Sequence, residues 1–573
     1  MVDEEKRTNE ALDASKKYNT VVEEANDYIE HFDILETITN VGNDEVFTPR
    51  KTCDMMLDSL PEEVWHNPLY KWLNPATKNG IFEREIALRL DKGLENVIPN
   101  KEERRKHILQ NMIFSIGQTK FTSNVARRTL YYCSQANRKC DGLKAPDGHY
   151  VNGYSIGNGS WFDDEEGNIK TPMAEHEFVD SSGRRMPSTC KGDDRKKYKC
   201  KCCGIPGNSK YNDANQRENY AYEFIHINHL IIEKHLSNRF FGGNRKMKFD
   251  IIIGNPPYQL NVGVQQDNYA IPIYQKFVEQ AISLNPRYLM MIIPAKWYSG
   301  GRNLDTFRAN MLSDRRIKKI VDFPNPYDCF ETVDNPGGIC FFLWDSKYDG
   351  DCEFVTSIGG KKSSVKRKLN EFPFFIRDAK GLSIVKKVKK QNINKGKTLD
   401  EKVSPQTPFG IITSYKPLEK GVPCWFKQKV GVQYVKKEDV SDLYGHLNKF
   451  KVLIPEAPIA GQTDFTKDIL LYYTGNTFIA APGECCSQTY LVASSFDTRK
   501  EAEYFQSYLL TKVVRFLILQ TVVSQHVARD RFIFVPDLGK YDHRYSDEEL
   551  LDMFGLSQED YAYIQTRVRN FGE

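Results

Sequence analysis

The feature that most constrains the fold of this chain is a series of short apolar runs separated by helix-like segments. The clearest runs cover residues 249–253, 288–293 and 338–344, and a helix is predicted over about residues 274–284, between the first two runs. A strand that is apolar along its whole length is typical of a parallel sheet, because helices cover both faces of such a sheet. The pattern therefore predicts an α/β fold with a parallel sheet.

Length and composition narrow the class of protein. A chain of 573 residues is too long for one ordinary domain, so two or three domains are expected. The N-terminal sequence is polar, and no run of about 18 apolar residues occurs, so neither a signal peptide nor a membrane span is expected. We therefore expect a cytoplasmic protein whose thirteen cysteines are thiols or metal ligands. The net charge of +4 does not identify a partner by itself.

A candidate catalytic turn, Asn255-Pro256-Pro257-Tyr258, follows the first apolar run. The exocyclic amino group of adenine is a poor nucleophile, because its lone pair is delocalised into the ring. Two acceptors for the amino protons, the Asn255 side-chain oxygen and the Pro256 carbonyl, would favour attack by this nitrogen. Consecutive prolines stiffen the turn that carries both acceptors, and Tyr258 offers a flat face for an extruded base. An alternative is a Pro-Pro turn with a packed tyrosine that only ends the strand.

These residues resemble the NPPY segment of the γ-type DNA adenine-N6 methyltransferases of restriction–modification systems. In that family a half that binds S-adenosylmethionine (SAM) precedes the catalytic segment, and a target-recognition domain follows it. The order of segments matches over residues 45–345, and the stretches at 460–464 and 524–526 resemble a subgroup of restriction-system methylases. The resemblance implies SAM as cofactor, double-stranded DNA as partner, and base flipping with Phe330 as a second aromatic on the adenine.

The resemblance also implies a SAM site. It comprises Phe47, Thr48, Pro49, Asn74, Pro75, Ala76, Gly80 and Asn255. Three departures from the family pattern occur: Asn74 stands where the SAM loop usually starts with Asp, Thr77 and Lys78 replace the usual small residues of that loop, and residues 115–119 lack the acid that normally binds the SAM ribose. Glu85, on the helix predicted after the loop, is our candidate substitute; the alternative is an ordinary exposed helix glutamate.

A polar, cysteine-containing stretch at residues 133–226 interrupts the α/β pattern and is predicted to be an insertion. Cys200 and Cys203 form a C-x-x-C knuckle, whose two sulfurs can bind one tetrahedral ion. We predict a structural zinc site completed by Cys133 and His176, with Cys140 and Cys190 as rival ligands. The alternative is a set of reduced thiols in a basic loop. No catalytic part is assigned to the metal, because methyl transfer needs no Lewis acid.

The predicted fold is α/β: a Rossmann-like SAM-dependent methyltransferase sheet with a cysteine-containing insertion and a C-terminal mixed α+β target-recognition domain. The predicted parts are a helical lead-in at 1–46, a methyltransferase domain at 47–345 containing the insertion, a target-recognition domain at 355–545, and a C-terminal helix at 546–573. Residues 361–368 are predicted to be a basic, serine-containing linker, and the region from about 371 to 541 a mixture of short strands and loops with a helix at 498–511.

The predicted function is site-specific methylation of adenine N6, as the modification component of a restriction–modification system with a separate endonuclease or helicase subunit as a further partner. One alternative is an enzyme that also cuts DNA, but Pro536-Asp537 is not followed by the E-x-K of a nuclease. A second is a non-catalytic DNA-binding homologue, favoured by the altered SAM loop. A third is methylation of an amino group in RNA or a protein amide.

Overall fold

The computed structural model divides into two compact units, which we describe separately. The first unit comprises residues 1–293 and 341–348, and the second comprises 294–340 and 349–573, so residues 294–340 group with the C-terminal half. The predicted lead-in helix lies outside the described residues. These are 46–117, 119–131, 135–137, 161–172, 174–208, 223–242, 248–260, 271–300, 303–330, 337–427, 430–457, 477–521 and 527–568.

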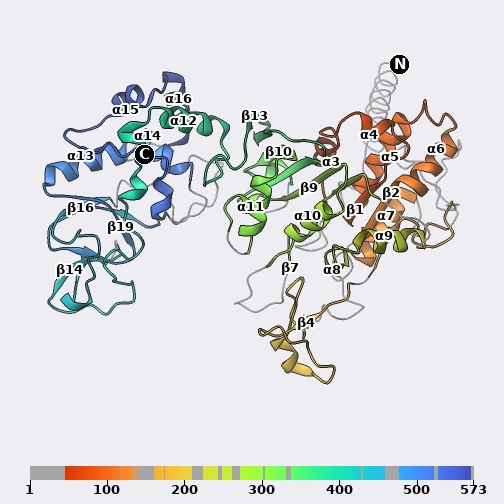
Figure 1. The fold of residues 1–573 in the computed structure, drawn as a ribbon, viewed down its shortest axis with the longest axis horizontal. Helices are drawn as coiled ribbons and strands as arrows, with labels where there is room; N and C mark the ends of the chain where they lie inside the picture. The colour runs from red at the N-terminus through yellow and green to blue at the C-terminus, as the bar shows by residue number, and fades with distance from the viewer. Residues whose placement is uncertain are drawn as a thin grey trace, which may run out of the picture. The chain divides into compact units, whose positions relative to one another are not determined.

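The first unit contains a mostly parallel sheet (Figure 1). Its strands lie in the order β11 (Ile339–Asp345), β9 (Tyr288–Pro294), β6 (Ile251–Gly254), β1 (Trp72–Thr77), β2 (Ile113–Gly117) and β3 (Ile169–Lys170). The pairs β9·β6, β6·β1, β1·β2 and β2·β3 are parallel. Every residue of β1, β6, β9 and β11 is buried, as expected for strands covered on both faces. The predicted α/β class and the three apolar strands are confirmed.

The sheet has a topological switch at its centre. The first strand of the chain, β1, lies between β2 on one side and β6 on the other, with Trp72 beside Ile113 and Ile251. From β1 the chain continues to β2 and β3 on one side of β1, and it returns to β6 and then β9 on the other side. The connections that leave the carboxyl ends of β1 and β6 therefore run in opposite directions. Such a point is where open α/β sheets bind their ligands. The NPPY turn follows β6, and the predicted SAM loop begins inside β1, at Asn74, and continues past the end of that strand.

Helices of the first unit connect and cover these strands. They are α3 (Arg50–Leu57), α4 (Glu63–His66), α5 (Ile81–Gly93), α6 (Lys101–His107), α7 (Lys120–Tyr131), α8 (Glu223–His226), α9 (Ile232–Phe241) and α10 (Tyr274–Ser283). Helices α5 and α7 pack against each other and against β1. Two short antiparallel pairs complete the unit: β4 (Phe178–Val179) with β5 (Lys199–Cys200), and β7 (Gln259–Leu260) with β8 (Ile271–Pro272).

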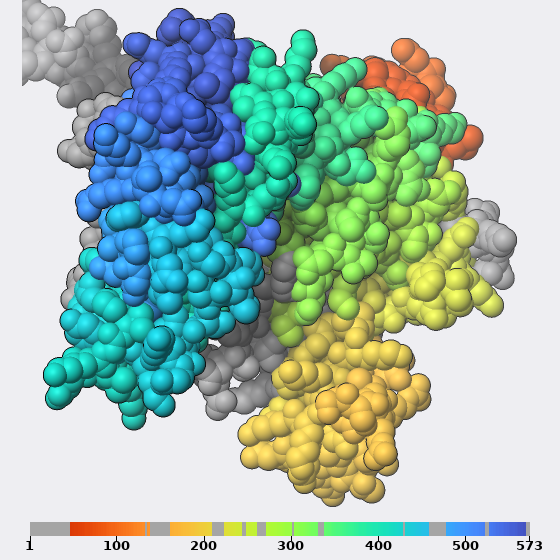
Figure 2. Space-filling view, turned by 60° about the vertical axis from the view of Figure 1, so that its left-hand side comes forward, coloured from red at the N-terminus to blue at the C-terminus, as the bar shows by residue number. Residues whose placement is uncertain are grey.

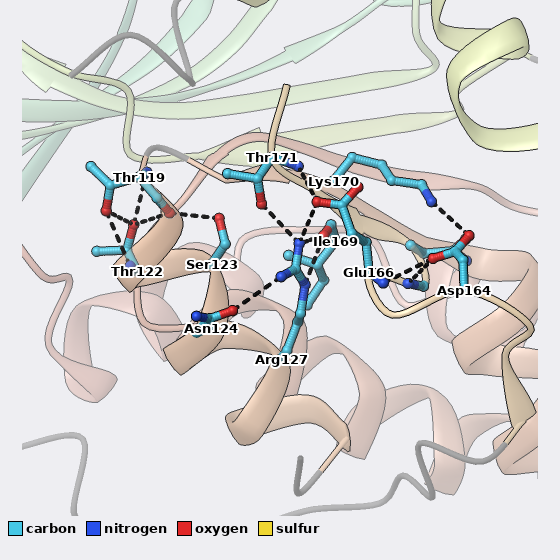
Figure 3. A network of polar contacts seen from close by, with 12 residues as sticks. Thr119, Thr122, Ser123, Asn124, Arg127, Asp164, Glu166, Ile169, Lys170 and Thr171 are labelled. Carbon is cyan, nitrogen blue, oxygen red and sulfur yellow. Dashed lines mark hydrogen bonds and ion pairs between the residues drawn. The ribbon is translucent and has the colours of Figure 1, made fainter. Parts of the chain in front are cut away.

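Part of the predicted insertion belongs to the main sheet. Strand β3 extends the sheet beyond β2, and Arg127 of α7 holds it there (Figure 3). The buried Arg127 guanidinium donates to the Ile169 carbonyl, to Glu166 at 2.8 Å and to the Thr171 hydroxyl at 2.8 Å. The hydrogen bonds of this one side chain therefore hold a polar segment that has few apolar contacts.

The second unit contains the strand order β13 (Lys361–Arg367), β12 (Cys352–Ile358) and β10 (Ile317–Phe323). β10 and β12 are parallel, and β12 and β13 are antiparallel over seven residue pairs. The prediction of a linker at 361–368 was therefore wrong. A turn at Gly359-Gly360, both with positive φ, folds this basic segment back onto β12, and its exposed lysines suit an edge strand.

The C-terminal part of the second unit has cores of its own, and Figure 1 shows it in green-blue to blue. Two three-stranded sheets have the orders β15 (Val432–Val435), β14 (Val422–Trp425), β18 (Cys485–Cys486) and β17 (Phe478–Ala480), β16 (Phe450–Pro455), β19 (Tyr490–Phe496). Its helices are α12 (Ala379–Lys390), α13 (Arg499–Leu510), α14 (Lys512–Leu519), α15 (Asp547–Phe554) and α16 (Gln558–Arg567), and α11 (Asp305–Ser313) precedes β10.

The single C-terminal helix predicted from residue 546 was wrong. Ser546 caps α15 as expected, by accepting a hydrogen bond from the Glu549 amide. Gly555 then adopts a left-handed conformation that ends α15, and Ser557 starts α16 with a capping box. No helix in the described ranges is long and apolar enough to cross a membrane.

The Arg127 network generates a prediction about local stability. Arg127→Ala leaves the buried Ile169 carbonyl without its donor, which should cost about 2 kcal/mol and speed amide exchange at residues 164–172 by roughly 30-fold. Hydrogen exchange measured by mass spectrometry tests this. Arg128→Ala, an exposed neighbour on the same helix, is the control. Equal exchange in the two variants would show that the network does not hold β3.

Candidate active site

Three segments that are distant in sequence meet at the carboxyl ends of β1 and β6. The Val46 carbonyl accepts hydrogen bonds from Lys78 Nζ at 2.9 Å and from Asn255 Nδ2 at 3.3 Å. Asn255 Nδ2 also donates to Thr48 Oγ1 at 3.1 Å. The structure therefore brings together three segments: residues 46–49, the loop after β1 and the NPPY turn.

The orientation of the Asn255 side-chain amide is fixed by these contacts. A backbone carbonyl can only accept, so the nitrogen of the amide must face Val46. Asn255 is 2% exposed, and its Oδ1 is buried with no hydrogen-bond partner among the described residues. An unpaired buried acceptor costs free energy, which a ligand that donates a proton there would recover.

Two glycines allow the backbones to approach. A Cβ on Gly254 would lie 2.5 Å from Asn74 Oδ1, so only glycine lets the residue before Asn255 sit against the β1 loop. Gly80 has a φ of +82°, and a Cβ there would lie 2.9 Å from the Ala126 Cα of helix α7. The loop after β1 thus needs glycine both for its conformation and for its packing.

The remaining residues of the NPPY turn differ in exposure. Pro256 and Pro257 are buried, whereas Tyr258 is half-buried, and its carbonyl accepts from the Ile273 amide at 3.2 Å. Phe330 belongs to the second unit and is only 1% exposed. A base could stack on Phe330 only after this side chain is uncovered.

A small cavity lies among the three segments. Five predicted SAM-site residues line it, namely Thr48, Asn74, Ala76, Gly80 and Asn255. Phe47, Pro49 and Pro75 are not among the lining residues. The lining also includes Thr77, Lys78 and Asn79 of the predicted SAM loop, and three residues that the sequence analysis did not assign to the site: Ile81, Phe82 and Glu83.

The acid at this cavity is Glu83 rather than Glu85. The Glu85 carboxylate bonds to Arg84 at 2.9 Å and lies 3.6 Å from Arg50, and Glu85 does not line the cavity, so the structure does not bring it together with the other predicted SAM-site residues. Glu83 is 1% exposed, and its Oε1 accepts from Asn74 Nδ2 at 2.9 Å and Ser115 Oγ at 2.6 Å. Its Oε2 is buried without a partner among the described residues.

A second cluster lies in the insertion. His176, Cys200, Cys203 and His226 offer ligand atoms that all lie within 4.8 Å of one another. Three of these were predicted ligands, and His226, at the end of α8, was not. Cys133 and the rival Cys140 lie outside the described residues, and Cys190 is not part of the group. A histidine 23 residues after the C-x-x-C knuckle was the available signal in the sequence.

The donor set of this cluster suits a soft, tetrahedral cation. A hydrogen bond from Cys203 lowers the pKa of the Cys200 thiol, and His176 and His226 lower it further. Thiolate sulfur and imidazole nitrogen in a two-and-two set are ligands that structural zinc takes. The four residues present therefore fit zinc.

Comparison with known proteins agrees with this geometry. The model of the Eco57I restriction-modification methylase family matches residues 111–330. An uncharacterized adenine-specific methylase of Mycoplasma pneumoniae (strain ATCC 29342 / M129 / Subtype 1) is 47% identical over 339 residues, which cover 58% of this chain and 75% of that protein. The chain belongs to the adenine-specific methylases. The predicted resemblance to adenine methyltransferases of restriction–modification systems is confirmed.

Solved structures similar to this adenine-specific methylase come from restriction–modification enzymes. The DrdV–DNA complex matches with a TM-score of 0.39 and 11% identity over 87% of this chain and 56% of that chain. The type IIL enzyme MmeI, in complex with DNA, matches with a TM-score of 0.37 and 10% identity over 91% and 73%. The M protein of the type I enzyme EcoKI matches with a TM-score of 0.27 and 10% identity over 55% and 48%. The chain spans about half the length of the DrdV and EcoKI proteins.

Proposed function

We propose that this adenine-specific methylase transfers a methyl group from SAM to adenine N6 in double-stranded DNA at a specific site, as the modification component of a restriction–modification system. The observation that carries the proposal is Asn255 Oδ1, a buried acceptor that has no partner in the described ranges and lies at the switch point of the sheet. A separate endonuclease or helicase subunit is the proposed further partner, and residues 355–545 are the proposed target-recognition domain.

The proposed chemistry needs an acceptor at this place. SAM supplies a methyl group on a sulfonium that is already an activated leaving group. Attack by N6 would form the new N–C bond as the C–S bond breaks and its electron pair returns to sulfur. The nitrogen would become positively charged and then lose one proton to solvent, so an acceptor would hold its protons more strongly than those of the planar amine. Asn255 Oδ1, fixed by the contacts of its Nδ2, is pre-oriented for this charge and stabilises it without rearrangement.

The structure gives no support for a nuclease site at Asp537, the residue that suggested DNA cleavage. Asp537 is buried, and its Oδ1 accepts from Tyr541 Oη at 2.9 Å and pairs with Lys402 Nζ at 2.9 Å. Its carboxylate is therefore engaged in the fold of the C-terminal unit.

Asn255→Ala should reduce kcat by about 100-fold or more, because it removes an acceptor that stabilises the transition state by on the order of 3 kcal/mol. Transfer of tritiated methyl groups to DNA from a methylation-deficient host measures this, and sequencing of modified bases in that DNA identifies the methylated site. Asn111→Ala, an exposed asparagine of the same unit, is the control. Normal turnover by the Asn255→Ala enzyme would refute the assignment.

We propose that Glu83 holds the ribose hydroxyls of SAM. The end of β2 cannot supply an acid, because a Cβ on Gly117 would lie 1.7 Å from Ser123 Oγ. Glu83 approaches the same strand from α5 through its bond to Ser115, two residues before Gly117 and on the same face of the strand. Its unpaired Oε2 is an acceptor that two hydroxyl donors would satisfy.

Glu83→Gln should weaken SAM binding by roughly 10- to 100-fold, because it removes a charge-assisted hydrogen bond while keeping the size of the side chain. Equilibrium dialysis with SAM and S-adenosylhomocysteine, in the absence of DNA, gives the dissociation constants. Glu85→Gln is the matched control, since that carboxylate faces Arg84. Stronger weakening in Glu85→Gln than in Glu83→Gln would reverse the assignment.

We propose that the target adenine is flipped out of the duplex and stacks on Tyr258, with Phe330 as a second aromatic. Flipping is required because N6 of a paired adenine is directed at its partner base. The support is the position of Tyr258, which is half-buried and directly follows Asn255-Pro256-Pro257.

Tyr258→Ala should slow methylation by roughly tenfold or more, since stacking of a base on an aromatic ring contributes about 1–3 kcal/mol. Tyr258→Phe keeps the ring and should have a mild effect. A duplex with the target adenine mismatched should bind more tightly than the matched duplex, because the base is already unpaired. Unchanged rates in Tyr258→Ala together with equal affinities for the two duplexes would exclude flipping onto this residue.

We propose that His176, Cys200, Cys203 and His226 hold a structural zinc ion. The support is the convergence of two thiols and two imidazoles from three segments, together with the chemistry of that donor set. The ion has no part in methyl transfer, and its ligands would fix the conformation of the insertion.

A further inference from the structure

We propose that the metal site of the insertion also positions the catalytic Tyr258, by holding helix α10 and the β7–β8 hairpin in place. This inference rests on the proposed zinc site and, for its effect on base capture, on the proposed methylation of adenine. It predicts that loss of the metal spares the SAM site and impairs capture of the target base.

The metal group joins segments that have little core of their own. In Figure 2 the orange and yellow residues of this stretch form a small lobe. Between residues 174 and 208 the described buried residues are Ala174, Cys200, Cys203, Ile205 and Gly207. Two of these five are ligands, so a bound ion would supply the cross-link that apolar packing does not.

Two of the ligand-bearing segments contact α10 directly. Lys276 Nζ donates to the Cys202 carbonyl inside the C-x-x-C knuckle. Gln280 Nε2 donates to the Phe224 carbonyl at 3.0 Å and to the Ile227 carbonyl at 2.7 Å, on either side of His226. The rings of Phe224 and Phe277 stack with centroids 5.9 Å apart. The knuckle and α8 therefore accept hydrogen bonds from α10 at two successive helical turns.

The start of α10 is tied to the catalytic turn. Ile273, directly before α10, donates its amide to the Tyr258 carbonyl at 3.2 Å, and β8 pairs with β7, which follows Tyr258. The knuckle also faces the hairpin, because a Cβ on Gly204 would lie 3.2 Å from Ile271 Cδ1. A continuous set of contacts thus runs from the metal ligands through α10 to Tyr258.

The SAM cavity depends on other contacts. Its residues are carried by β1 and α5, with Thr48 and, at the end of β6, Asn255, which is fixed by the Val46 carbonyl and Thr48. None of them is a metal ligand or a partner of Lys276 or Gln280 in the described contacts. Metal loss should therefore affect SAM binding and base capture differently: SAM still binds, but the Tyr258 ring on which the base would stack is misplaced. A misplacement of about 1 Å can reduce rate by about two orders of magnitude.

The test uses the full chain and three variants. Cys203→Ser removes a ligand, Lys276→Met removes the contact between the knuckle and α10 but no ligand, and Cys190→Ser is the control in the same insertion. Metal content by atomic emission, SAM dissociation constants, hydrogen exchange at residues 271–283, and the fluorescence of 2-aminopurine at the target position of a duplex are measured for each.

We expect about one zinc per chain in the wild type, Cys190→Ser and Lys276→Met, and a loss of zinc in Cys203→Ser. Cys203→Ser should keep its SAM dissociation constant within twofold, exchange faster at residues 271–283, and lose most of the 2-aminopurine signal. Lys276→Met should show the same changes in weaker form with its zinc retained, which separates positioning from a general loss of folding.

Three outcomes would overturn the inference: a wild type without zinc, a zinc-free Cys203→Ser with normal exchange at 271–283, or equal loss of SAM binding and base capture in that variant. Failure of the proposed function is distinguishable, because a wild type that never methylates DNA or brightens 2-aminopurine can still show metal-dependent exchange at 271–283. In that case the role of the metal site in positioning α10 is supported, and the assignment of adenine methylation is refuted.

Discussion

The Val46 carbonyl is the acceptor on which the architecture of the site depends. It receives Lys78 Nζ from the loop after β1 and Asn255 Nδ2 from the turn after β6, so one oxygen fixes both segments. The same contact decides which way the Asn255 amide points, and therefore leaves Oδ1 toward the cavity. The Val46 carbonyl is satisfied by its two donors, whereas Asn255 Oδ1 has no partner among the described residues and is the group that we propose accepts an amino proton of adenine.

Close approach of backbones makes this arrangement possible. Gly254 lets the end of β6 lie against Asn74, and Asn74 in turn donates to Glu83. Asparagine at position 74 has a donor that aspartate would lack, which suits the neighbouring Glu83 carboxylate. The hydrogen bond between Asn74 and Glu83 thus accounts for the asparagine at the start of the loop and for the acid in the first turn of α5.

The insertion illustrates how polar segments gain a defined structure without a large apolar core. Residues 164–171 are held by the guanidinium of Arg127, and in the knuckle region two thiols and two imidazoles converge where we propose a metal ion. In both cases a few strong, directional interactions replace the many weak contacts of a core.

The sequence by itself determined the strands of the sheet and the Pro-Pro turn, because short apolar runs that alternate with helix-like segments are typical of buried parallel strands, and consecutive prolines restrict the backbone wherever they occur. Tertiary structure decided which side chains face the site. Glu83 and Glu85 lie about 200° apart around one helix, so only the direction of the preceding loop selects Glu83. The strand at residues 361–367 needed β12 as a partner, and α14, apolar on nearly every side, could not be told from a buried strand by its pattern. His226 joins the cysteines only through the path of the chain between them, because metal ligands are set by proximity in space and local sequence carries no record of it.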